Sequence, residues 1–149
     1  MKKITSIFLV VFCLCFSIAL AAAQGERSAE QWYDQGNQYF DSGEYTQAVD
    51  AYTKSIEVDP HAEAYSNRGS AYGKLNQLDR AIEDYTKAII INPKFAEAYN
   101  NRGIAYDGLN QKEKAIESYQ LFLNYADHTT MDKEIEAVKK RILVLNGGK

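Results

Sequence analysis

The stretch AYSNRGSAY, from Ala64 to Tyr72, recurs almost unchanged as AYNNRGIAY from Ala98 to Tyr106, 34 positions later. Such a repeat marks either two copies of a chemical site or two copies of a structural unit. The two interpretations predict different functions, and the residues around the motif distinguish them.

The repetition covers most of the chain. Three segments align in one register: residues 29–60, 62–93 and 96–127. Small residues recur at equivalent positions, as glycine (Gly36, Gly69, Gly103) and, twelve positions later, as alanine (Ala48, Ala81, Ala115). Aromatic residues recur in three sets: Trp32, Tyr65, Tyr99; Tyr39, Tyr72, Tyr106; and Tyr52, Tyr85, Tyr119. This regularity indicates structural repeats, and we expect the eight tyrosines of these sets to lie in the core.

Each copy predicts two helices. Apolar residues recur at spacings of three and four, and a polar break near the middle of each copy separates the helices. Pro60 and Pro93 are expected to end the second helices of their copies, and Ser28 with Gln31 predicts a capping box before the first helix. Small residues suit a close crossing of two antiparallel helices. One hairpin cannot bury its apolar face alone, so about three must stack.

These positions resemble the tetratricopeptide repeat family, whose pattern places Trp, Gly, Tyr, Ala, an aromatic residue and Pro at these intervals. The matching residues are Trp32, Gly36, Tyr39, Ala48, Tyr52 and Pro60; Tyr65, Gly69, Tyr72, Ala81, Tyr85 and Pro93; and Tyr99, Gly103, Tyr106, Ala115 and Tyr119. The resemblance implies an all-α fold, a right-handed α-solenoid of three helix-turn-helix repeats. The repeats would cover residues 29–61, 62–95 and 96–127, after a short linker at 24–28.

The chain departs from the family pattern in two places. Gln35, Arg68 and Arg102 replace the leucine beside the glycine, and Asp127 replaces the last proline. We expect Arg68 and Arg102 to form pairs between repeats, because they lie next to the glycines of the helix crossing.

Residues 128–149 predict a capping helix and a short tail. The apolar residues of this segment recur at steps of four, three, four and three: Met131, Ile135, Val138, Ile142 and Leu145. They therefore share one side of a helix. Such a helix covers the last exposed apolar face of a stack of repeats, and the Asn-Gly-Gly sequence at 146–148 ends it.

Residues 1–23 have the layout of a secretory signal peptide, with Lys2 and Lys3 before an apolar run that ends in small residues. The composition becomes polar at Gln24, which favours cleavage after Ala23. We therefore expect an exported protein, periplasmic or secreted. The alternative is a membrane anchor that is not cleaved, because the apolar run approaches the roughly 20 residues that span a bilayer. Only in that case would we expect contact with a membrane.

Composition excludes some kinds of site and partner from the cleaved protein. Both cysteines, Cys13 and Cys15, lie in the leader, so cleavage removes every thiol and sulfur ligand. Without Lys2 and Lys3, about 15 basic and 20 acidic side chains remain, a net charge of about −5 with neutral histidines. The chain therefore lacks the basic surface that a nucleic-acid partner would require.

No cluster of residues in the sequence predicts an active site. The two histidines, His61 and His128, lie at separate turns, with no cysteine to complete a metal site or a nucleophile pair. We interpret His61 as an exposed linker residue. The carboxylates are spread along helix surfaces, and no phosphate-binding or dinucleotide-binding glycine pattern occurs. We expect no enzyme activity, no metal and no cofactor.

The resemblance implies a binding surface. In this family the first helices of successive repeats line a concave groove that holds an extended segment or a helix of another protein. Carried onto this chain, the groove strip comprises Glu30, Asp34, Asn37 and Asp41; Glu63, Asn67, Ser70 and Lys74; and Glu97, Asn101, Ile104 and Gly108. The contacts with the partner are expected from Tyr33, Asn37, Asn67, Ser70, Asn101 and Ile104. A carboxamide can both donate to and accept from a peptide backbone, which suits the equivalent residues Asn67 and Asn101.

The charge of the groove strip predicts the charge of the partner. One variant of the family holds a chaperone's C-terminal carboxylate with Asn and Lys or Arg. Asn37 and Asn67 fit that pattern, but Tyr33, Glu97 and Asn101 stand where its cations belong. The glutamates of the strip instead favour a neutral or basic partner segment.

Two alternatives stay open from the sequence. Asn67 and Asn101 can be ordinary solvated residues, with the glutamates of the strip complementing the positive helix N-termini. The module can also self-associate or serve as a subunit of an envelope assembly. The sequence does not predict the oligomeric state.

Overall fold

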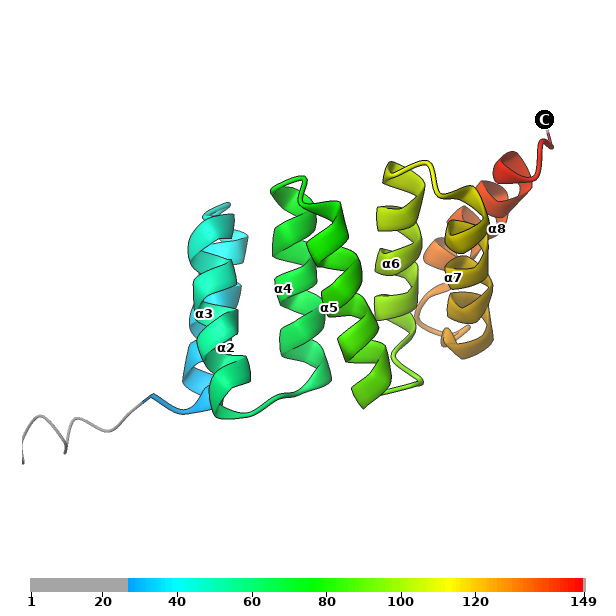
Figure 1. Ribbon diagram of the computed structural model, residues 1–149. Coiled ribbons are helices and arrows are strands. Elements are labelled where there is room, and N and C mark those ends of the chain that lie inside the picture. Colours follow the sequence, from blue (N-terminus) through cyan, green and yellow to red (C-terminus); the bar gives the residue numbers. More distant parts are fainter. Residues whose placement is uncertain (1–26, 149) are drawn as a thin grey trace, which may run out of the picture.

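The computed structural model describes residues 27–148, which form helices and no strand. The helices are α2 (Ala29–Asp41), α3 (Tyr45–Val58), α4 (Ala62–Lys74), α5 (Leu78–Ile91), α6 (Ala96–Gly108), α7 (Lys112–Tyr125) and α8 (Asp132–Leu145). Figure 1 shows them as a row of antiparallel hairpins, α2 with α3, α4 with α5 and α6 with α7, followed by α8. The prediction of an all-α solenoid of three helix-turn-helix repeats and a capping helix is confirmed.

The predicted signal peptide at 1–23 lies outside the described residues. Within residues 27–148, every helix is too short or too polar to cross a membrane.

The helix ends follow from short-range backbone chemistry. The Ser28 hydroxyl accepts a hydrogen bond from the Gln31 N–H, while the Gln31 side chain accepts one from the Ser28 N–H at 3.0 Å. This is the predicted capping box, and it satisfies two N–H groups that a helix start leaves without partners. Helices α3 and α5 each end two residues before a proline, Pro60 and Pro93, as expected.

The tight turns inside the hairpins depend on residues with positive φ. Gly43 has φ 79° in the first hairpin, and Asn76 and Asn110 each have φ 57° in the second and third. Glycine and asparagine tolerate this backbone region better than other residues. The polar breaks in the sequence are therefore the points at which the chain reverses.

One contact recurs in every repeat and holds each hairpin together. The tyrosine of the second helix lies directly on the glycine of the first. A Cβ atom would lie 2.5 Å from the Tyr52 ring at Gly36, 2.9 Å from the Tyr85 ring at Gly69, and 2.6 Å from the Tyr119 ring at Gly103. All three tyrosines are buried. Since real Cβ atoms essentially never approach so closely, each of these positions requires glycine.

Gly69 and Gly73 on α4 offer a matched test of this contact. Gly69→Ala would force its methyl group against the Tyr85 ring and 3.2 Å from the Ala81 carbonyl oxygen. We expect it to lower the free energy of unfolding by about 1–3 kcal/mol. At Gly73 the nearest atom to an added Cβ outside the helix backbone is the Tyr85 hydroxyl oxygen, 3.9 Å away. Gly73→Ala should therefore be neutral or stabilise the protein by about 0.5–1 kcal/mol through helix propensity.

Denaturant unfolding followed by circular dichroism measures both changes. Equal effects of the two substitutions would contradict the role assigned to the glycine–tyrosine contact.

The eight repeat tyrosines, predicted to lie in the core with their hydroxyls near water, all lie in the core clusters or pack against them, but half of them are only partly buried. Tyr39, Tyr65, Tyr72 and Tyr106 are partly exposed. Three of these rings have a cation over them, from Lys87 over Tyr65 at 5.6 Å, Arg80 over Tyr72 at 5.5 Å and Lys114 over Tyr106 at 5.4 Å. The stems of long basic side chains can cover apolar surface while their charges stay in water, so these tyrosines need no complete burial.

Arg68 stabilises the packing of the first two repeats. Its guanidinium donates to both carboxylate oxygens of Asp84, at 2.7 and 2.8 Å, and to the Thr53 hydroxyl at 3.0 Å. Thr53 belongs to the preceding repeat, so the expected pairing between repeats is confirmed for Arg68. Arg102 instead donates to Ser118 at 3.2 Å, within its own repeat. For Arg102 the structure shows a pair inside the repeat, because serine replaces the aspartate there.

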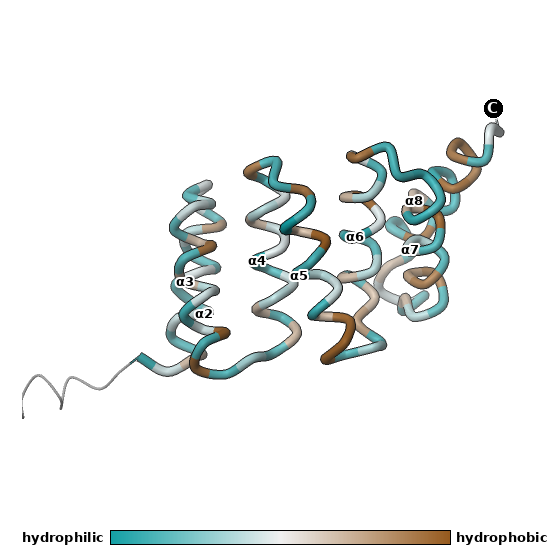
Figure 2. Tube along the Cα trace, in the orientation of Figure 1, coloured by the Kyte–Doolittle hydropathy of each residue, from teal (hydrophilic) through white to brown (hydrophobic). Residues whose placement is uncertain are grey.

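Helix α8 covers the end of the stack as predicted. Ile135 and Val138 are buried in the last core cluster, and the other residues of the predicted stripe pack against it: Met131, Ile142 and Leu145. Figure 2 shows hydrophobic and hydrophilic residues alternating along α8, as expected for a helix with one buried side. Asn146 is the C-cap residue of α8, and Gly147, with φ 82°, follows it and ends the helix.

Candidate functional site

A pocket of about 350 Å³ lies between α2 and α4, the first helices of the first two repeats. Its lining residues are Asn37, Phe40, Asp41, Tyr52, Asn67 and Ser70. We call it the polar pocket. Three of the residues expected in the binding site, Asn37, Asn67 and Ser70, lie together in it, and a fourth, Tyr33, is hydrogen-bonded to Asn67.

A hydrogen-bond network fixes the side chains of the polar pocket. The Tyr52 hydroxyl donates to Asn37 Oδ1 at 2.8 Å, and Asn67 Nδ2 donates to the same oxygen at 3.1 Å. Asn67 Nδ2 also lies 3.0 Å from the Tyr33 hydroxyl oxygen. The network spans both repeats, so the pocket is held in shape by the packing of α2 on α4.

His61 takes part in this region, contrary to its interpretation as an exposed linker residue. It is half-buried, its ring packs edge-on against Tyr33 with centroids 5.4 Å apart, and its Nδ1 donates to the Asp59 carbonyl oxygen at 2.8 Å. It occupies the residue before α4, where the next repeat has Phe95 before α6. Both residues place a ring beside the start of a first helix, but the contact of His61 with Tyr33 has no counterpart at Phe95 among the aromatic pairs of the described residues.

The surroundings of the polar pocket are acidic. Burial raises the pKa of the Tyr33 hydroxyl, and the charges of Glu63 and Asp34 raise it further. Burial also raises the pKa of Tyr52, with an additional contribution from Asp41. Both hydroxyls therefore stay neutral at ordinary pH, and the nearby carboxylates favour a cation over an anion in this space.

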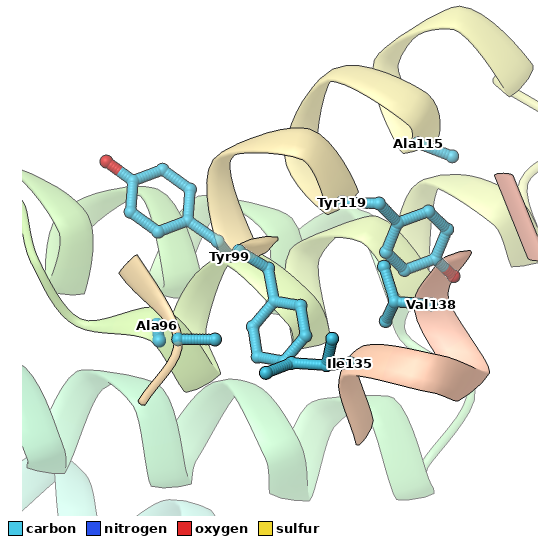
Figure 3. Close-up of a cluster of buried hydrophobic side chains, with 8 residues drawn as sticks. Ala96, Tyr99, Ala115, Tyr119, Ile135 and Val138 are labelled. Carbon is cyan, nitrogen blue, oxygen red and sulfur yellow. The ribbon is translucent and has the colours of Figure 1, made fainter. Parts of the chain in front are cut away.

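A second pocket, of about 250 Å³, lies at the other end of the same face, between α6 and the capping helix α8. Its lining residues are Asn100, Ile104, Tyr119, Glu134, Ala137, Val138 and Arg141. We call it the apolar pocket, and we call the face of the first helices that carries both pockets the groove. Figure 3 shows the Val138 side chain of α8 against the Tyr119 ring. Ile104, another of the expected site residues, is 55% exposed here.

The two pockets differ because of the residue that follows the packing glycine. After Gly36 comes Asn37, which accepts from Tyr52, and after Gly69 comes Ser70, whose hydroxyl lies 3.2 Å from that of Tyr85. The equivalent residue of the third repeat is Ile104, which offers no hydrogen bond. Tyr119 instead interacts with the Asp107 carboxylate.

Asp107 also connects the third repeat to the capping helix. Arg141 of α8 donates to its carboxylate, with Nη2 2.7 Å from Oδ1. Within this pair each partner balances the charge of the other, so Glu134 is the one lining charge of the apolar pocket that forms no ion pair among the described residues.

Because Tyr119 of the apolar pocket has a raised pKa, we predict that the protein loses stability at alkaline pH. Burial, and then the Asp107 charge, raise the pKa of Tyr119 to about 12 in the folded protein, against about 10 in an unfolded chain. The neutral form is thus favoured by folding. The contribution of Tyr119 to the free energy of unfolding is complete below pH about 10. It disappears as the pH rises toward 12, because the tyrosine releases its proton at a lower pH in the unfolded chain than in the folded one.

The free energy of unfolding, measured by urea titration from pH 9 to 12, should fall with pH. The fall should be smaller in Tyr119→Phe, which removes the ionising hydroxyl. The same pH dependence in both proteins would show that Tyr119 is not responsible.

Asn101 does not join the polar network. It is half-exposed on α6, one repeat beyond Asn67, and it lines neither pocket. The structure therefore places Asn67 among fixed partners and leaves Asn101 as a more accessible amide on the same helix as Ile104.

Other features of the described residues offer no comparable site. A larger, open hollow of about 610 Å³ lies at the turn between α4 and α5, where it is lined by turn residues and the end of α6. Within residues 27–148, no three histidine, cysteine or acidic side chains come together as they would to hold a metal ion.

Comparison with known proteins identifies the architecture. The family model described as "Tetratricopeptide repeat" matches residues 62–95, a second with the same description matches residues 84–117, and a "TPR repeat" model matches residues 36–76. The first TPR domain of Spaghetti (RPAP3), solved with the HSP90 peptide SRMEEVD, is 30% identical, with a TM-score of 0.68. The alignment covers 77% of this chain and 93% of that domain. The chain belongs to the tetratricopeptide repeat family.

Other solved TPR domains are similar to this TPR protein. The TPR2B domain of yeast Sti1, in a complex with an Hsp70 peptide, has a TM-score of 0.73 and 30% identity, over 76% of this chain and 94% of that one. The Arabidopsis OM64 TPR domain has a TM-score of 0.72 and 28% identity, over 77% and 93%. A comparison with curated proteins found no match.

Proposed function

We propose that this TPR protein is an exported, non-catalytic adaptor whose groove binds an extended, neutral or basic segment of a partner protein. The observation that carries the proposal is the polar pocket, in which Asn37 and Asn67 hold amide groups at the surface of two adjacent first helices, and the buried Tyr52 hydroxyl fixes Asn37 from below. Amide and hydroxyl groups in such a position can pair with the backbone of a peptide whatever its side chains are.

The similar proteins support a peptide as the kind of ligand. TPR domains of Spaghetti (RPAP3) and yeast Sti1 were solved with HSP90 and Hsp70 peptides. The HSP90 peptide SRMEEVD has three acidic residues and one basic residue. Asp41 lines the polar pocket of this chain, and Asp34 and Glu63 lie near Tyr33 beside it, so we infer a partner segment that, unlike SRMEEVD, is neutral or basic.

Loss of both groove asparagines should abolish capture of the partner. We expect the purified protein, used as bait in an extract of its own cells, to retain a partner that the Asn67→Ala, Asn101→Ala double variant does not retain. The reason is the loss of two amides that would pair with the peptide backbone. Mass spectrometry of the retained proteins provides the measurement.

Asn124→Ala is the matched control, since Asn124 is exposed on α7, a second helix of its repeat. It should retain the partner as the unchanged protein does. Thermal melts must show that the double variant is folded. Undiminished capture by a folded double variant would exclude the groove as the binding site.

Export rests on the sequence of residues 1–23 alone. If the leader is cleaved after Ala23, the protein recovered from its natural source should begin at Gln24. Its intact mass should then equal that of residues 24–149. Recovery of the uncleaved mass in a membrane fraction would instead support the membrane-anchored alternative.

One observation favours self-association as a second candidate function. Val58, Ile91 and Tyr125 are equivalent residues at the C-terminal ends of the second helices, and all three are 40–57% exposed. Ile90, beside them, is 73% exposed, and Figure 2 shows this end of α5 as hydrophobic. Sedimentation velocity separates the two candidates, because a strict monomer at high concentration contradicts self-association.

A further inference from the structure

The two pockets of the groove are copies of one site in the repeat register. Asn37 of the polar pocket is equivalent to Ile104 of the apolar pocket, and Tyr52 is equivalent to Tyr119. The wall that α4 provides in the first case is provided by the capping helix α8 in the second. The two pockets therefore occupy equivalent positions in the repeat but are lined by side chains of different polarity.

The polar pocket has the acceptors and the charge that a basic side chain needs. The Asp41 carboxylate lies at its edge, and within the described residues it forms no ion pair. The Asn67 amide adds an oxygen atom that can accept a further hydrogen bond, because its nitrogen alone is engaged in the network. Phe40 contributes an aromatic surface for the apolar stem of a lysine or an arginine.

Basic groups near the polar pocket do not neutralise it. Arg68 is held by Asp84, and Lys54 lies 4.3 Å from the centre of the Trp32 ring. Lys74, at the end of α4, is the one lysine on the groove strip; it does not line the pocket, and its single positive charge is outnumbered by the carboxylates near Tyr33 and Tyr52. Asp34 and Glu63 add negative charge around Tyr33. The field in the polar pocket therefore attracts a cation.

The apolar pocket suits an uncharged, branched side chain. Ile104 is 55% exposed, and Val138 and Ala137 of α8 face the same space. The basic group at its edge, Arg141, is paired with Asp107. Burial of an aliphatic side chain against these residues would be favourable, because it removes apolar surface from water on both partners.

We propose that the groove selects a segment with two anchors, a basic residue in the polar pocket and an aliphatic residue in the apolar pocket. This inference rests on the proposed peptide-binding function and specifies the ligand of that same groove. It commits to an extended segment of a partner protein as the occupant, on the basis of the charge of one pocket and the apolar lining of the other.

The geometry of the stack sets the spacing of the anchors. The polar pocket lies between α2 and α4, and the apolar pocket lies between α6 and α8, two helix steps further along. Neighbouring first helices make few direct contacts, so we take about 10 Å per step, the upper end of the spacing of packed helices, which gives a separation of about 20 Å. An extended chain advances about 3.3 Å per residue. The two anchors should therefore be about five or six positions apart in the sequence of the partner.

Selection from a random library tests this motif directly. A library of random nine-residue peptides displayed on phage would be selected on the purified protein and, in parallel, on the Asn67→Ala, Asn101→Ala variant. The peptides enriched only on the unchanged protein should carry Lys or Arg and, five or six positions away in either direction, Leu, Ile or Val.

Synthetic copies of the enriched peptides then assign each anchor to its pocket. By fluorescence anisotropy, Asp41→Asn should weaken binding about threefold to tenfold at low salt, and less at high salt. Asp50→Asn, an exposed position on α3, should change nothing. Ile104→Ser should weaken binding about tenfold, while Ile90→Ser, on the exposed end of α5, should not.

Paired substitutions complete the assignment. Replacing the basic residue of the peptide by alanine should remove the effect of Asp41→Asn, and replacing the aliphatic residue should remove that of Ile104→Ser. Asp41 and Ile104 are both largely exposed, so both variants should fold, and their melting temperatures check this.

The outcomes separate this inference from the proposed function. Peptides that need the groove asparagines but lack the two anchors, or carry acidic residues in place of the basic one, would overturn the inference and leave peptide binding intact. Peptides that bind the double asparagine variant equally well, or a selection that yields no binder, would contradict the groove function and the inference together.

Discussion

The contact between a glycine on the first helix and a tyrosine on the second is the constraint on which the whole structure depends. It occurs once per repeat, at Gly36, Gly69 and Gly103, and a Cβ atom at any of them would lie within 3 Å of the ring. Because glycine has no side chain, the two helices can cross closely, and the tyrosine ring fills the space beside the crossing. The repeat therefore needs glycine and tyrosine together, since neither alone produces this packing.

The same tyrosines connect the core with the groove. Their rings are buried, while the hydroxyls of Tyr52 and Tyr85 reach the residue that follows the glycine, Asn37 or Ser70. A side chain that stabilises the hairpin thus also orients a polar residue of the groove. The residue after the glycine lies outside the core, so it can change between repeats without loss of the fold, and it decides whether a pocket is polar or apolar.

Much of the fold could be predicted because the residues that determine it repeat. The glycines, alanines, tyrosines and prolines gave the hairpins and their ends, and the apolar stripe gave the capping helix. Features that do not repeat were missed. Asp84, which binds Arg68, is equivalent to Ala51 and Ser118 in the other repeats, so no pattern revealed the ion pair. The contact of His61 with Tyr33 depends on the path of a linker, which the spacing of helical residues does not specify.

The sequence predicted individual residues of the candidate site, but it did not predict how they group into two pockets. The family resemblance implied a set of groove residues, and the structure brings Tyr33, Asn37, Asn67 and Ser70 together while it separates Ile104 and Asn101 from them. The second pocket could not be foreseen, because it forms between a repeat and a helix that has a different sequence. Helix α8 must be apolar on one side to close the core, and Val138, two repeat lengths after Ser70, belongs to that side. The need to cap the stack thereby makes the last pocket of the groove apolar. In an array of only three repeats, the residues that end the fold are also residues that shape the binding surface.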